Sequence, residues 1–189
     1  MTTSLNWVIA LVQLPSEPSR HRVAVWRELR RAGAVPIAQG VWAVPDTPAF
    51  QASVTRADEL TRAGGGVLAI YAITPRDERA RSLVVDAFAA ARRDEWAEFS
   101  ADCTKLEAEI SAEITKRKFT FGELEEEEQS LDRLRRWFRD LKRRDVLALA
   151  EADEAEALLR RCEVVVNDFA ELVYEAMRAS PPRPDPQIS

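Results

Sequence analysis

The first 75 residues alternate apolar segments of strand length with amphipathic segments of helical length, and this order restricts the fold more than any other feature. The apolar segments are residues 5–14, 34–37, 41–44 and 67–73. Two segments with helical periodicity, residues 20–32 and 48–63, occupy the gaps after the first and the third of them. Glycines follow both helical segments, as they do at many helix ends.

The resulting order is strand, helix, strand, strand, helix, strand. It predicts an α+β fold in which residues 1–75 form a ferredoxin-like β-α-β-β-α-β domain, with an antiparallel sheet and both helices on one face. Gln39 and Gly40 suit a tight connection between the two middle strands. The other face of the sheet is expected to need cover from the remaining residues or from a second subunit.

Residues 76–179 show almost no strand signal. Apolar residues recur there at alternating spacings of three and four, which is the pattern of helices that pack along one seam. We therefore expect an all-α region of about three long antiparallel helices. Residues 180–189 are rich in proline and are expected to be a disordered tail. The predicted seam residues are Trp96, Phe99, Cys103, Leu106 and Ile110; Leu131, Leu134, Phe138 and Leu141; and Leu158, Cys162, Val165, Phe169, Leu172 and Ala176.

The composition is that of an ordinary folded chain, with 46% hydrophobic and 31% charged residues among 189. No apolar run approaches the length that crosses a bilayer, and the N-terminus lacks signal-peptide features, so we expect a cytoplasmic protein without a membrane partner. The net charge of -5 hides an asymmetry, because residues 1–75 carry +2 and residues 76–189 carry -7. A local basic patch can still bind phosphate, since its field acts over about 10 Å at moderate salt.

The first helical segment has an arginine-bearing side. Arg20, Arg27 and Arg31 are spaced by seven and four, so they fall nearly on one line of a helix. Val25 and Leu29 fall on the opposite side and are expected to dock on the sheet. The arginine row is then either a contact surface for nucleic-acid phosphates or a small oxyanion, or a solvated helix face.

Residue types that carry catalysis are scarce. His21 is the sole histidine, and it lies between Arg20 and Arg22, either as an exposed residue at a helix start or as part of an anion pocket. The three glycines from Gly64 follow a helix and precede a strand, which is the reverse of a phosphate-binding loop. The acidic run at residues 122–128 favours the start of a helix. We therefore expect no enzyme activity, no catalytic or metal site and no cofactor.

A second basic cluster lies within residues 133–144. Ion pairing with the acidic stretches of the helical region is the favoured role, and a wider DNA-facing patch is the alternative. The outward residues of this cluster are Arg135, Arg136, Arg139, Lys142 and Arg143.

Four strings occur in a characteristic order: WRELRRAGA at residues 26–34, GVWAVP at 40–45, the triple glycine, and KFTFGELEEEE at 118–128. Together they resemble the N-terminal domain of ChrB, the chromate-resistance regulator of bacteria, over roughly residues 5–178. The first half also resembles the ferredoxin-like domain of PaaX-type repressors. It is similar to the small CRISPR adaptation nuclease too, but residues 12–14 read Val-Gln-Leu where that family places a metal-binding carboxylate, which argues against nuclease activity.

The resemblance to ChrB implies a DNA-binding transcription regulator of chromate-resistance genes that responds to chromate. Fuller ChrB-like proteins continue into a second, C-terminal domain, so we expect either DNA binding without chromate sensing or action with a separate partner. The first-helix residues to which the resemblance assigns the contact are Arg20, Arg22, Arg27, Arg30 and Arg31.

Two other functions stay open alongside the regulator. An oxyanion sensor would bind chromate or sulfate at Arg20, His21 and Arg22, with Trp26 or Trp42 close by. A non-enzymatic scaffold would use the long helices and the uncovered sheet to form a homodimer, and a homodimer is the oligomer that we expect.

Two cysteines, Cys103 and Cys162, both fall in predicted helices. They are too few and too dispersed for a disulfide framework or a closed metal site, so their seam positions predict buried core thiols. Chromate is an oxidant, which makes redox sensing by these thiols a further alternative.

Overall fold

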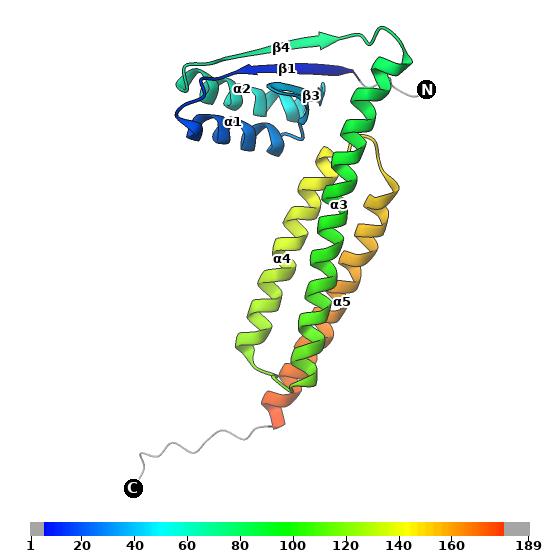
Figure 1. Ribbon diagram of the computed structural model, residues 1–189. Coiled ribbons are helices and arrows are strands. Elements are labelled where there is room, and N and C mark those ends of the chain that lie inside the picture. The colour runs from blue at the N-terminus through cyan, green and yellow to red at the C-terminus, as the bar shows by residue number, and fades with distance from the viewer. Residues whose placement is uncertain (1–5, 180–189) are drawn as a thin grey trace. The chain divides into compact units, whose positions relative to one another are not determined.

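The computed structural model describes residues 6–179, apart from the side chain of Ala49 (Figure 1). Within that range the fold is α+β, as predicted, with a four-stranded antiparallel sheet followed by three long helices. The predicted disordered tail, residues 180–189, lies outside the described residues. The elements are β1 (Trp7–Gln13), α1 (Ser19–Arg31), β2 (Val35–Ala38), β3 (Val41–Pro45), α2 (Pro48–Ala63), β4 (Val67–Ile73), α3 (Glu78–Thr115), α4 (Phe121–Arg144) and α5 (Ala150–Ala179).

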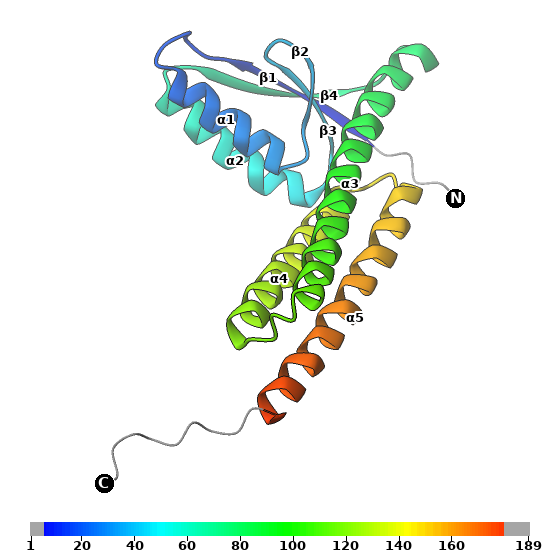
Figure 2. The ribbon, with the colours of Figure 1, turned by 60° about the horizontal axis from the view of Figure 1, so that its bottom comes forward.

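The sheet has the strand order β2-β3-β1-β4, and every neighbouring pair is antiparallel. This is the order that the ferredoxin-like β-α-β-β-α-β pattern predicts. Helices α1 and α2 lie side by side on one face of the sheet (Figures 1 and 2). Thr47 caps α2 by accepting a hydrogen bond from the Phe50 amide at 3.4 Å, with Pro48 in the first turn.

The chain divides into two compact units, Met1–Arg93 and Asp94–Ser189. The sequence places the boundary at residues 75 and 76, and that division stays a prediction. Residues 78–93 of α3 belong to the first unit because they pack with the sheet: the rings of Trp7 and Phe88 meet edge to face, with centroids 5.2 Å apart.

The core of the first unit lies between the sheet and the two helices. Val25 and Leu29 of α1 are buried against side chains that alternate along the strands, among them Ala10, Trp42 and Val44. The alternation follows from the two-residue period of a strand, which sends every second side chain to the helical face.

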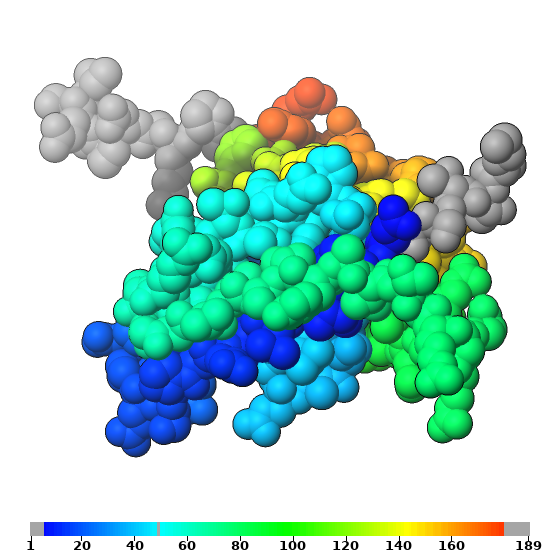
Figure 3. Space-filling model, turned by 90° about the horizontal axis from the view of Figure 1, so that it is seen from above, coloured from blue at the N-terminus to red at the C-terminus, as the bar shows by residue number. Residues whose placement is uncertain are grey.

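The opposite face of the sheet is partly covered. Trp7 lies under Phe88, and the Arg92 guanidinium lies over the Phe88 ring, 4.9 Å from its centroid. On β4, however, Val67 and Tyr71 are 59% and 57% exposed. Figure 3 shows β4 and β1 side by side on this face, in teal to green and in blue.

The second unit is built from the rest of α3 with α4 and α5, which lie side by side (Figure 1). The predicted seam of α3 is buried throughout, from Trp96 to Ile110. The predicted α5 seam is confirmed at Cys162 and Phe169, which are buried. Leu159, Val166 and Val173 are buried in place of the predicted residues 158, 165 and 172, which are only partly buried. Both sides of this helix are apolar at those turns, so the spacing alone did not choose between adjacent positions.

The turn between α4 and α5 is fixed by one buried carboxylate. Asp145 Oδ2 accepts a hydrogen bond from the Trp96 indole at 3.2 Å and another from the Leu149 amide at 3.1 Å.

Among residues 6–179, no helix has both the length and the apolar character needed to cross a bilayer.

Gly40, between β2 and β3, combines a positive φ of 71° with a close approach, since a Cβ there would lie 2.6 Å from the Val12 carbonyl oxygen. We expect Gly40→Ala to lower the free energy of unfolding by about 2–4 kcal/mol. Gly65 has nearly the same φ, 72°, with no atom within 4 Å of such a Cβ. Gly65→Ala should therefore cost only about 1 kcal/mol. Urea denaturation of both variants measures the difference, and equal losses would contradict the steric account.

Candidate nucleic-acid interface

Helix α1 carries the candidate interface, and its orientation follows from two buried side chains. Val25 and Leu29 are one turn apart and are 2% and 1% exposed, so they fix one side of the helix on the sheet. The helix ends at Arg31, and the Ala34 amide donates to the Leu29 carbonyl oxygen at 2.9 Å. Gly33 supplies the positive φ, 85°, that this helix end requires.

Three of the predicted arginines point away from the sheet. Arg20, Arg27 and Arg31 are exposed. Arg31 Nη2 forms an ion pair with Glu28 Oε1 at 2.8 Å, whereas Arg20 and Arg27 have no carboxylate partner among residues 6–179. Arg22 is likewise exposed and has no carboxylate partner in that range, so the guanidinium groups of Arg20, Arg22 and Arg27 are available to an external anion.

A groove lies beside α1, between this helix and the β2–β3 turn. Its volume is about 270 Å³, and its polar lining includes the Arg22 and Gln39 side chains, while Trp26 and Trp42 supply its aromatic walls. Trp26 is 49% exposed, and the Arg30 guanidinium lies 5.5 Å from the centre of its ring, within the range of a cation–π contact. The groove thus combines aromatic faces with a donor-rich edge. Gln39 is a lining residue that the sequence did not single out, because a turn residue carries no signal of facing a helix.

His21 lies on another side of α1. It is half-buried beside Gly64 at the end of α2, where a Cβ on that glycine would come within 2.8 Å of the histidine Cβ. Arg20 Nε donates to its Nε2 at 3.4 Å. Of the trio Arg20, His21 and Arg22, it is Arg22 that lines the groove with the two tryptophans.

The second basic cluster, on α4, is largely ion-paired. Arg135 contacts Asp132 at 3.3 Å and Glu163 at 2.8 Å, and the hydrogen bond from Glu163 raises the pKa of Arg135 above its ordinary value. The other two pairs are Arg143 with Asp140, and Lys142 with Asp153 at 3.9 Å. Arg136 and Arg139 are exposed and have no carboxylate partner within the described part of the chain.

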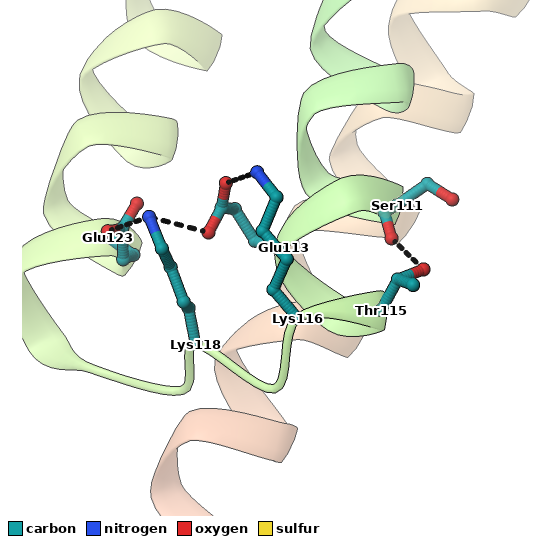
Figure 4. A network of polar contacts seen from close by, with 6 residues as sticks. All are labelled: Ser111, Glu113, Thr115, Lys116, Lys118 and Glu123. Atoms are coloured by element: carbon teal, nitrogen blue, oxygen red, sulfur yellow. Dashed lines mark hydrogen bonds and ion pairs between the residues drawn. The ribbon is translucent and has the colours of Figure 1, made fainter.

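The acidic run at the start of α4 holds the α3–α4 turn (Figure 4). Lys118 lies between Glu113 of α3 and Glu123 of α4, with its Nζ 3.3 Å and 3.2 Å from their carboxylate oxygens. Lys116 also pairs with Glu113, at 3.2 Å. Thr120 caps α4 by accepting a hydrogen bond from the Glu123 amide at 3.3 Å. These contacts give Glu123, the first carboxylate of the run, a structural role.

Glu127 differs from the rest of the acidic run because it is only 8% exposed. Burial, followed by the nearby carboxylates of Glu109 and Glu113, raises the pKa of Glu127 to about 7.

In the described range, residues 6–179, no group of three or more histidine, cysteine or carboxylate side chains is placed to hold a metal ion.

A sequence model described as Protein ChrB, N-terminal, matches residues 22–180. The chain belongs to the ChrB N-terminal family. The ChrB match covers most of the arginine side of α1, from Arg22 onward, and the whole of the second basic cluster. No curated protein and no solved structure matches the chain.

The raised pKa of Glu127 predicts a pH-dependent loss of stability. The folded state holds the Glu127 proton more tightly than the unfolded chain, so stability falls as the pH rises from about 4.5 through 7. We expect Glu127→Gln to raise the free energy of unfolding by about 1–3 kcal/mol at pH 8 and to change it little at pH 5. Denaturant titrations at the two pH values measure this, with Glu128→Gln, on the exposed side of α4, as the control. A gain that is the same at both pH values would exclude ionisation as its cause.

Proposed function

We propose that this ChrB N-terminal chain is a DNA-binding transcription regulator of chromate-resistance genes, and that it contacts DNA phosphates through the arginines of α1. It acts as a cytoplasmic homodimer and catalyses no reaction. The observation that carries the proposal is the pair of unpaired, exposed guanidinium groups, Arg20 and Arg27, on a helix whose other side is fixed to a sheet. Family membership supports the regulatory role.

Phosphate contacts by α1 agree with the charge distribution. Glu28 is the only acidic residue of α1, and it is paired with Arg31. Arg22 and Arg30 lie on the side of α1 that carries the exposed ring of Trp26, which allows a stacking contact next to the phosphate contacts. A chain with net charge -5 can bind DNA in this way, because a Debye length of about 10 Å limits the repulsion from its distant carboxylates.

A salt titration tests this role. The full chain is titrated with a fluorescent duplex from upstream of its own operon, at several salt concentrations, as wild type and as Arg20→Ala/Arg27→Ala. Each lost phosphate contact releases about one counterion fewer, so the slope of log K against log salt should fall in magnitude by about 2 in the double variant. Affinity at moderate salt should drop about tenfold or more.

The matched control removes two arginines from α2 of the same unit. Arg56 and Arg62 are exposed and paired with Glu59 and Asp58, so Arg56→Ala/Arg62→Ala lowers the charge by the same amount. This control should keep the wild-type slope. An equal loss of affinity in both double variants would mean that net charge, not α1, governs binding, and no binding at low salt would refute the DNA role of the chain.

A second candidate function is suggested by the groove beside α1. Arg22, Gln39 and the indole rings of Trp26 and Trp42 would suit an oxyanion such as chromate or sulfate. Sulfate binding at this site should change tryptophan fluorescence and should be lost in Arg22→Ala. The change should weaken less in moderate sodium chloride than DNA binding does, because one anion contact releases fewer counterions than several phosphate contacts. Fluorescence that sulfate leaves unchanged would exclude this candidate.

A further inference from the structure

Two cysteines that lie 59 positions apart in the chain meet in the core of the helical unit. Cys103 is on α3, Cys162 is on α5, and both side chains are 0% exposed. Both are free thiols, and Cys162 Sγ–H donates to the Cys103 carbonyl oxygen at 3.5 Å. The seam positions predicted burial for each residue, but they gave no sign that the two occupy the same layer.

The two thiols differ in the ease with which they ionise. The hydrogen bond with Cys162, together with burial, raises the pKa of Cys103 above its ordinary value. The hydrogen bond with Cys103 lowers the pKa of Cys162, which the charge of Arg161 also favours. Cys162 is therefore the thiol of the pair that ionises more readily.

A polar contact lies next to this thiol pair and joins the same two helices. Glu107 follows Cys103 by one turn of α3, Arg161 directly precedes Cys162, and Arg161 Nη2 is 2.5 Å from Glu107 Oε2. The Arg161 side chain is 63% exposed. The other carboxylate oxygen of Glu107 is buried and has no hydrogen-bond partner in the described range, residues 6–179. A polar contact that reaches the protein surface therefore lies next to the buried thiols.

We propose that Cys103 and Cys162 form a reversible oxidation site that closes to a disulfide between α3 and α5 when the protein meets a hydroperoxide. The Cys162 thiolate attacks one peroxide oxygen, the O–O bond breaks, and a sulfenic acid and hydroxide form. The Cys103 sulfur then attacks the sulfenic sulfur, and its proton leaves with the hydroxyl group as water. Overall, two thiols and one hydrogen peroxide give one disulfide and two water molecules.

The disulfide changes the helical unit without requiring a change of fold. It joins two helices across the 59 positions that include all of α4, so it restricts the unfolded chain far more than the folded one. The thermal midpoint of the oxidised protein should therefore be at least about 5 °C above that of the reduced protein.

The test is made on the full chain. The reduced protein is exposed to hydrogen peroxide, denatured, treated with iodoacetamide and weighed by intact-mass spectrometry. The reduced sample should take up two alkyl groups. The oxidised sample should take up none, should be lighter by the mass of two hydrogen atoms, should yield a peptide pair that joins Cys103 to Cys162, and should revert with dithiothreitol. Because this measurement needs no DNA, its result is independent of the proposed function.

Single variants provide the matched controls. Cys103→Ala and Cys162→Ala should each keep one oxidisable thiol and form no intramolecular link, with circular dichroism checking that they fold. The mass of the oxidised wild-type protein shows by itself whether the disulfide forms, so the test does not depend on whether a variant folds. Two alkylatable thiols after prolonged peroxide treatment, sulfinic acid without a cross-link, or a disulfide between two chains would each overturn the proposal.

Discussion

The packing of Val25 and Leu29 on the sheet determines how α1 presents its arginines. These side chains lie among Ala10, Trp42 and Val44, and burying each one contributes about 1.5–3 kcal/mol. Because the buried pair is one helical turn apart, it fixes the rotation of α1 about its own axis. Arg20 and Arg27 must then point outward. The buried apolar residues of α1 therefore account for the exposure of these arginines, without any contact made by the arginines themselves.

The two arginine-rich helices of the chain differ in their neighbours more than in their composition. On α4, carboxylates of the same helix and of α5 meet three of the five outer basic residues. On α1, Glu28 is the sole acidic residue, and it engages Arg31. Exposed ion pairs of this kind are weak, about 0–1 kcal/mol each, but an external phosphate must still displace them. This difference favours α1 over α4 as the site of a phosphate contact.

The order of elements could be predicted from the sequence because each element carries its own local signal. Four short apolar runs, two amphipathic helices and their glycine ends determine the strand order and the helical face of the sheet. The long helices were equally clear from their spacing. The predicted rotation of α5 about its own axis was partly wrong. Leu159 and Val166 are buried, but the residues before them, Leu158 and Val165, are also apolar and were predicted instead.

The structural features that the sequence did not predict all depend on contacts between residues that are far apart in the chain. No local pattern indicates that Cys162 contacts Cys103, or that Gln39 of a turn lines a groove with Arg22. His21 illustrates the same limit, because its side of α1 meets the end of α2 at Gly64. Helical periodicity gives the angle of a side chain around its own helix, but it does not identify the neighbour at that angle.

We propose that α1 contacts DNA through arginines that have no carboxylate partner in the described part of the chain. The most direct measurement is NMR of the arginine Nε–Hε signals of the full chain, with and without a duplex from upstream of its operon. The signals of Arg20 and Arg27 should shift and exchange more slowly with water on DNA binding, while that of Arg135, held by Glu163, should stay in place. Shifts confined to the arginines of α4, with those of α1 unchanged, would contradict the account.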